Sequence, residues 1–115
     1  MSLPPQLPQI IDLFKASRSA YEIYLADGKT FRYAMELKKH NSRIMELLAA
    51  CLPSLSSELK EDANALLTHY HAWTSKWEAL AAAIRPQAND VFVFENEVTF
   101  PREAARRLQA ACEQL

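Results

Sequence analysis

The longest regular hydrophobic pattern in the chain lies between Ser57 and Arg85. This stretch contains neither glycine nor proline, and its apolar residues recur at alternating intervals of four and three positions. Such spacing places them on one face of an α-helix. The sequence therefore predicts a single long helix whose apolar face must be covered by other elements. The residues on that face are Leu59, Ala63, Leu66, Tyr70, Trp73, Trp77, Leu80 and Ile84.

Two earlier stretches carry the same kind of pattern. Gly28 ends the first, because glycine readily takes the left-handed conformation found after helix C-termini. The second begins after Thr30, a predicted N-cap, and Pro53 ends it. The first stripe comprises Leu7, Ile10, Phe14, Ser17, Tyr21 and Tyr24, and the second comprises Ala34, Leu37, Asn41, Ile44, Leu48 and Cys51. Asn41 interrupts the second stripe, where a polar residue can fix helix register at a cost in stability.

Residues 21–33 allow a second interpretation. Tyr21 and Tyr33 flank Asp27-Gly28, and this arrangement also resembles a β-hairpin with a tight turn. We favour a helix here, because the apolar stripe is continuous from Leu7.

The helical pattern breaks down between Pro86 and Phe100. Two short apolar runs, 91–94 and 98–100, flank the polar sequence Glu95-Asn96-Glu97. They form either a small hairpin or an extended strap whose phenylalanines plug the bundle. The phenylalanines of this segment are Phe92, Phe94 and Phe100. A last helix, Pro101 to Leu115, is rich in small residues that permit close packing against a neighbour.

These patterns predict one all-α domain covering residues 1–115. Its expected architecture is an up-and-down four-helix bundle with a short extended or hairpin segment, at about 91–100, before the last helix. The chain has 115 residues and one glycine, whereas sheet-rich folds need glycine in their turns. The long helix would measure ~43 Å and the first two ~27–35 Å. We therefore expect its Trp77–Ile84 half to be covered by the strap or by a second copy, and its Leu59–Trp73 half to be core.

The sequence offers little chemistry for catalysis. His69 and His71 lie on opposite sides of one helix and cannot share a metal ion, and we predict neither metal nor cofactor. Cys51 and Cys112 belong to apolar faces, where cysteine behaves as a small hydrophobic residue. No glycine-rich loop is present to hold a phosphate. We therefore expect a protein that is not an enzyme.

His40 and Arg43 have the spacing found in histidine-containing phosphotransfer domains, which are helical bundles of similar size. Those domains place a small residue after the basic position, and Ile44 stands there in this chain. We therefore interpret His40 as an ordinary histidine on a helix surface.

The expected function is a non-enzymatic protein–protein interaction module, such as a small adaptor, regulator or chaperone, that self-associates as a homodimer. An alternative is a small apolar-ligand site between helices around Tyr70, Trp73 and Trp77. The expected interaction or ligand surface comprises Tyr70, Trp73, Trp77, Leu80, Ile84, Phe92, Phe94 and Phe100, with most weight on the Trp77–Ile84 half and the strap.

Nucleic-acid binding is a weaker alternative. The second and fourth predicted helices carry basic residues that together would make a strip: Arg32, Lys38, Lys39, Arg43, Arg102, Arg106 and Arg107. A net charge of −1 argues against it, because nucleic-acid binders usually carry a basic excess. No apolar run approaches the ~20 residues of a membrane span, and no signal peptide is evident. We expect a cytoplasmic protein.

Overall fold

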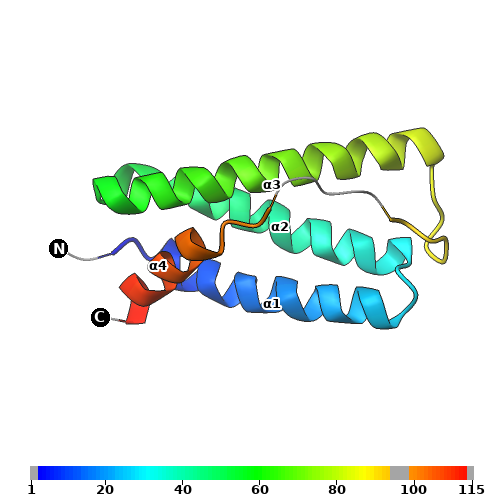
Figure 1. The fold of residues 1–115 in the computed structure, drawn as a ribbon, viewed down its shortest axis with the longest axis horizontal. Helices are drawn as coiled ribbons and strands as arrows, with labels where there is room; N and C mark the ends of the chain where they lie inside the picture. Colours follow the sequence, from blue (N-terminus) through cyan, green and yellow to red (C-terminus); the bar gives the residue numbers. More distant parts are fainter. Residues whose placement is uncertain (1–2, 94–98, 114–115) are drawn as a thin grey trace.

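A computed structural model describes residues 3–93 and 99–113. Four α-helices follow one another: α1 (Gln6–Ala26), α2 (Phe31–Cys51), α3 (Ser57–Ile84) and α4 (Arg102–Glu113). One short 3-10 helix, η1 (Leu52–Ser54), links α2 to α3. The helices run alternately up and down, and the described residues contain no β-strand (Figure 1). The predicted all-α bundle is confirmed.

The helix ends explain why the chain turns where it does. Gly28 has a φ of 79°, and the N–H of Lys29 donates to the Tyr24 carbonyl at 2.8 Å, which closes the end of α1. The helix rather than the hairpin is therefore correct for residues 21–26. Ser56 caps α3, because its hydroxyl oxygen accepts from the N–H of Leu59 at 3.3 Å.

One predicted cap is wrong in its chemistry. Thr30 occupies the N-cap position of α2, but its side chain makes no capping hydrogen bond. Its hydroxyl instead donates to the Asp27 carboxylate at 3.0 Å. The Thr30 hydroxyl thus acts as a donor to the turn and does not accept from an N–H of the first turn of α2.

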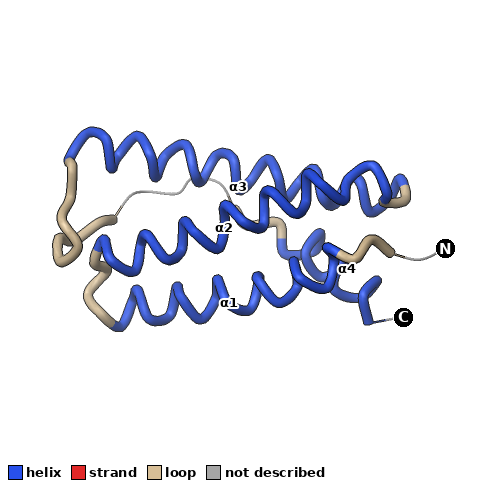
Figure 2. The backbone as a smooth tube through the Cα atoms, turned by 180° about the vertical axis from the view of Figure 1, so that it is seen from behind, coloured by secondary structure: helices blue, strands red, loops and turns tan. Residues whose placement is uncertain are grey.

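The four helices do not pack symmetrically. α2 packs against both α1 and α3, and α4 packs against α3 and α1. The backbones of α1 and α3, both fully described, do not come within contact distance of each other. α4 is about half the length of the other three and lies beside the first part of α1, as Figures 1 and 2 both show. The space between α1 and α3 is therefore bridged by a helix at one end only.

The buried apolar side chains form two clusters along the bundle. The first lies at the end near both termini and contains Leu7, Ile10, Ile44, Leu48, Leu66 and Leu108 among others. The second lies at the other end and contains Ala20, Tyr24, Ala34, Leu37, Trp77 and Phe92. Between the two clusters, Ser17 of α1 and Asn41 of α2 meet through a hydrogen bond of 2.7 Å. The core is thus divided by a polar layer at mid-height.

The segment after α3 folds back onto the turn between α1 and α2. The N–H of Phe92 donates to the Lys29 carbonyl and that of Phe31 donates to the Asp90 carbonyl, both at 2.8 Å. Phe92 is fully buried, with its ring 5.0 Å from Trp77 and 5.1 Å from Phe31. For residues 91–93 the strap interpretation is therefore correct. Phe94 lies outside the described residues, as do residues 95–98.

The strap covers only part of the Trp77–Ile84 half of α3. Trp77 is 5% exposed, and its indole N–H donates to the Ala34 carbonyl at 3.2 Å. Leu80 is half-buried against the same cluster. Ile84 remains 51% exposed in the single chain. The prediction that this half is covered holds for Trp77 but not, within one chain, for Ile84.

Candidate functional site

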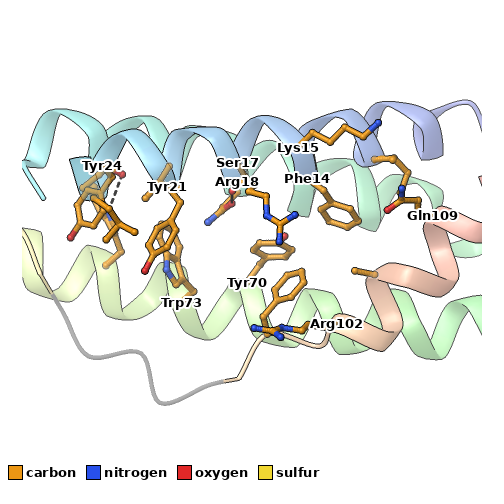
Figure 3. Close-up of a pocket in the computed structure, with 18 of the residues that line it drawn as sticks. Phe14, Lys15, Ser17, Arg18, Tyr21, Tyr24, Tyr70, Trp73, Arg102 and Gln109 are labelled. Carbon is orange, nitrogen blue, oxygen red and sulfur yellow. Dashed lines mark hydrogen bonds between the residues drawn. The ribbon is translucent and has the colours of Figure 1, made fainter. Parts of the chain in front are cut away.

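An open cleft of about 940 Å³ lies where α1 and α3 fail to meet. Residues of all four helices line it, together with Lys29 and Val93 from the connecting segments. Figure 3 looks into it, with α1 on one side and α3 on the other. Seven aromatic side chains form most of its apolar wall: Phe14, Tyr21, Tyr24, Tyr70, Trp73, Trp77 and Phe100.

The aromatic wall follows from the helical periodicity. Phe14, Ser17, Tyr21 and Tyr24 recur on one face of α1 at intervals of three and four, and Tyr70, Trp73 and Trp77 do the same on α3. In a complete four-helix bundle these faces would be buried against a fourth helix of full length. Among the described residues, the short α4 covers only one end of these faces, although Tyr24, Tyr70 and Trp77 are each at most 8% exposed.

The polar layer lies in the floor of this cleft. The Ser17 hydroxyl donates to the carbonyl oxygen of Asn41, which is only 6% exposed. Within the described part of the chain, neither the side-chain nitrogen of Asn41 nor the hydroxyl of Tyr70 forms a hydrogen bond, although both residues line the cleft. Tyr70 is 4% exposed, and burial raises the pKa of its hydroxyl. It therefore stays protonated and available as a donor.

The described charged residues that line the cleft are all cations. Lys15, Arg18, Lys29, Arg102 and Arg106 line it, and no aspartate or glutamate does so among the residues described. Arg106 forms an ion pair with Glu103 on the same helix. For the other four cations, the structure from 3 to 93 and 99 to 113 shows no ion-pair partner. Figure 3 shows Arg18 reaching from α1 toward Tyr70, with Arg102 on the far side of the opening.

The predicted surface residues separate into several groups. Tyr70, Trp73, Trp77 and Phe100 meet at the cleft. Phe92 and Leu80 instead belong to the second core cluster, Ile84 is exposed, and Phe94 is outside the described residues. The assignment of Leu59–Trp73 to core agrees with Tyr70, which is 4% exposed and belongs to the first core cluster, and Trp73 is half-buried against the second cluster. Both residues also line the cleft.

The sequence patterns did not single out the cations of the cleft. Lys15 and Arg18 each follow directly after a stripe position, so they lie at the border of the apolar face of α1. Their position beside Phe14 and Ser17 was the available signal. Arg102 was assigned to a basic strip shared by the second and fourth helices, but the backbones of α2 and α4 do not come close to each other in the described structure.

The other basic residues of that strip are mostly engaged within the chain. Lys38 pairs with Glu78 at 3.1 Å and lies 4.7 Å from the Trp77 ring centre. Arg43 pairs with Glu46 at 2.9 Å. The Arg107 guanidinium forms a bidentate pair with the buried Asp62 carboxylate, with contacts of 2.8 to 3.0 Å. These contacts tie helices together or neutralise charge locally.

The titratable groups elsewhere are scattered. Cys51 is buried and Cys112 half-buried, both are free thiols, and burial raises the pKa of each. His69 is buried against Tyr70 and Phe100, its Nδ1 has no hydrogen-bond partner among the described residues, and burial lowers its pKa. No group of three or more His, Cys, Asp or Glu side chains gathers in the described structure as a metal site would require.

Among the described helices, none combines the length and the apolar character needed to span a bilayer. Comparison with protein-family models, curated proteins and solved structures found no match for this chain.

Proposed function

We propose that this chain is a non-enzymatic binding protein whose α1–α3 cleft holds a small molecule with a largely apolar body. The observation that carries the proposal is the cleft itself, about 940 Å³ in volume and walled by seven aromatic rings. Small-molecule sites typically measure roughly 300–1,000 Å³ and combine an apolar wall with a few placed polar groups. This supports the ligand-binding alternative over a purely structural role for Tyr70, Trp73 and Trp77.

Packing energetics also support a ligand site in the cleft. Protein interiors are close-packed, whereas this cleft leaves aromatic rings of the described helices in contact with solvent. In this bundle the space is bordered by an aromatic wall on two helices and by unpaired polar groups of Asn41 and Tyr70. Water can occupy the polar part, but an apolar body would cover the rings better.

The lining residues also support binding rather than catalysis. The described lining includes no histidine, cysteine or carboxylate, so it offers no ordinary general base. The Ser17 hydroxyl donates to Asn41, an amide that cannot accept its proton as a base would. The groups that remain are rings, hydrogen-bond donors and cations, which suit recognition.

Phenylnaphthylamine, a neutral aromatic fluorophore, provides a direct test. Trp73 and Trp77 are the only tryptophans and both line the cleft, so energy transfer from them to the probe reports occupancy. We expect saturable binding that weakens about tenfold, or ~1.4 kcal/mol, in Ala105→Phe, which fills the cleft. Ala83→Phe, on the exposed side of α3, is the matched control and should bind as the wild type does. Absence of binding, or equal binding by both variants, would contradict the proposal.

A second candidate function has its own observation. Large apolar side chains are exposed at the end of the bundle away from the termini, where α1 ends, α2 begins and α3 ends. They are Ile23 (49%), Leu25 (44%), Met35 (42%), Ile84 (51%), Val91 (65%) and Val93 (52%). Groups of exposed apolar residues often mark protein interaction surfaces. This end supports the interaction-module alternative, with a protein partner or a second copy as the occupant.

Sedimentation velocity over a wide concentration range tests that second candidate. If a second copy covers the apolar end, we expect a concentration-dependent dimer that Ile84→Glu shifts to monomer. Glu58→Lys, at the opposite end of α3, is the control for a surface charge change. A monomer at every concentration would remove self-association from consideration.

A further inference from the structure

We propose that the molecule held in the α1–α3 cleft is an amphipathic anion, with a carboxylate or similar oxyanion head bound by Arg18, Arg102 and Tyr70 and an apolar tail lying along Trp73 and Trp77. This inference rests on the proposed function, because it specifies the chemical class of that ligand. The inference adds that the ligand is negatively charged and that its charged head lies beside Arg18, Arg102 and Tyr70.

The first argument is charge complementarity. Four cations line the cleft without an ion-pair partner in the described structure, and no described carboxylate lines it. Like charges concentrated around an opening produce a positive potential, which attracts an anion and is relieved when one binds. The rim of the cleft therefore selects for negative charge.

A solvated basic surface would look different, and this chain contains examples. On α2, Arg43 pairs with Glu46, and on α4, Arg106 pairs with Glu103, each three residues apart along one helix. Arg18 and Arg102 form no ion pair in the part of the chain that the structure describes, although Glu22 and Glu103 are close to them in sequence. They come from different helices and approach the same opening, with Arg18 directed toward Tyr70 (Figure 3). Convergence from separate elements is the arrangement expected of a binding site.

The polar layer provides the second, independent argument. Tyr70 is 4% exposed and Asn41 is 6% exposed, yet the Tyr70 hydroxyl and the Asn41 side-chain nitrogen have no partner among the described residues. Neither atom is among the fully buried polar atoms that lack a partner in the described structure, so water reaches both. A ligand that displaces this water must supply an acceptor, because a buried donor without one is unfavourable by about 1–3 kcal/mol. Both groups line the cleft, so an acceptor placed there would satisfy them.

The chemistry of these groups defines the head group. The Ser17 hydroxyl already donates to the Asn41 oxygen, so the groups that remain at the polar layer and on the two arginines are donors: the Asn41 amide N–H, the Tyr70 O–H and the two guanidinium groups. A carboxylate or sulfonate presents only acceptors and matches such a set, whereas an amine or an ammonium group does not. Beyond the layer, toward the second core cluster, the wall is formed by Trp73, Trp77 and Tyr21, which suits an aromatic or acyl tail.

A matched pair of probes tests the charge. Anilinonaphthalenesulfonate and phenylnaphthylamine share one ring system and differ in the sulfonate. We expect the wild-type chain to bind the sulfonate about tenfold more tightly than the neutral probe, as charge-assisted hydrogen bonds predict. Raising the ionic strength should reduce that preference, because salt screens the cations at the rim.

Variants then identify the residues responsible. Arg18→Gln, Arg102→Gln and Tyr70→Phe should each lower the ratio of the affinity for the sulfonate to the affinity for phenylnaphthylamine. Arg43→Gln and Tyr33→Phe make the same changes at positions that do not line the cleft, and they should leave the preference intact. Because Tyr70→Phe removes only a hydroxyl, it keeps the ring that packs against His69 and Phe100.

The outcomes separate the two proposals. Binding of the neutral probe without any preference for the sulfonate would overturn this inference and leave the proposed function standing. Equal loss of preference in the cleft variants and in the control variants would also overturn it, because the sulfonate would then be bound by surface charge in general. Failure of both probes to bind would contradict the proposed function itself.

Discussion

At the residue scale, the hydrogen bond between Ser17 and Asn41 decides how the core of the bundle is divided. Both side chains interrupt apolar stripes on their own helices, and the 2.7 Å contact pairs them at the same height. A buried polar pair of this kind favours one helix register over others, since a slip would leave both groups unpaired. The pair also keeps the floor of the cleft polar.

This interpretation predicts the effect of removing the pair. Asn41→Ala should lower the free energy of unfolding by about 1–3 kcal/mol, because it leaves a cavity and removes the acceptor of the Ser17 hydroxyl. The double variant Ser17→Ala/Asn41→Leu should be more stable than Asn41→Ala, because neither polar group is left buried alone. Urea unfolding followed by circular dichroism measures both. A double variant less stable than the single one would contradict this account.

A second prediction concerns His69, whose pKa is lowered because its ring is buried beside Tyr70 and Phe100. Above pH ~6.5 the histidine is neutral in both the folded and the unfolded chain, so it contributes no pH dependence. Below that pH the unfolded chain takes up the proton first, and the free energy of unfolding falls until the folded chain is protonated as well.

Replacement of the two neighbouring histidines tests this. Thermal unfolding between pH 7 and pH 5 should show a smaller loss of stability in His69→Phe than in the wild type. His71→Phe changes an exposed residue and should retain the wild-type loss. An unchanged loss in His69→Phe would show that another group is responsible.

The sequence revealed these residues individually but not their contacts. Asn41 was recognisable as a polar interruption in an apolar stripe, and Ser17 occupies the equivalent place on its own helix. Ser17 and Asn41 meet because of how far α1 and α2 are offset along the bundle axis. The turn at Gly28 sets this offset. Arg18 was missed because a cation at the edge of a stripe normally points to solvent.

At the element scale, α4 determines the site because it is short and is held at one end of the bundle. Its buried residues Ala104 and Leu108 join the first core cluster, and its Arg107 pairs with Asp62 near the start of α3. These contacts fix α4 beside the first part of α1, and no other described helix bridges the rest of the α1–α3 space. Its existence was predictable from Pro101 and the apolar spacing, but its position was not, because that depends on contacts remote in sequence.

Two arginines on α4 provide a comparison. Arg107→Ala should lower the melting temperature more than Arg106→Ala does. The first change leaves the Asp62 carboxylate buried without its partner, whereas the second removes an exposed pair with Glu103 three residues away. Differential scanning calorimetry makes the comparison. Equal melting temperatures for the two variants would mean that the Asp62–Arg107 pair does not hold α4 in place.

The strap is the other element that shapes the bundle. Phe92 is fully buried between Phe31 and Trp77, so Phe92→Ala should lower the free energy of unfolding by about 3–5 kcal/mol. The neighbouring Val91 is 65% exposed, and Val91→Ala should have a small effect. Urea titrations followed by tryptophan fluorescence would measure both. Similar midpoints for the two variants would contradict the role of Phe92 as the residue that closes this end.

At the scale of the whole molecule, the bundle is long and narrow, with extents of 48 × 23 × 20 Å, and its two core clusters lie at opposite ends. Helix lengths, turn positions and the break after Pro86 were all readable from sequence, because each follows from local periodicity and from glycine or proline. The cleft was not readable, because it exists only where α1 and α3 fail to meet. The patterns on Tyr21 and Trp73 look the same whether a fourth helix covers them or not.

The central claim is that the α1–α3 cleft binds a small amphipathic anion, and a crystal structure of the chain with anilinonaphthalenesulfonate tests it most directly. The account predicts the probe between α1 and α3, with its rings against Trp73 and its sulfonate within hydrogen-bonding distance of Arg18 or Tyr70. A probe bound instead at the exposed apolar end, beside Ile84 and Val91, with the cleft containing only water, would contradict it.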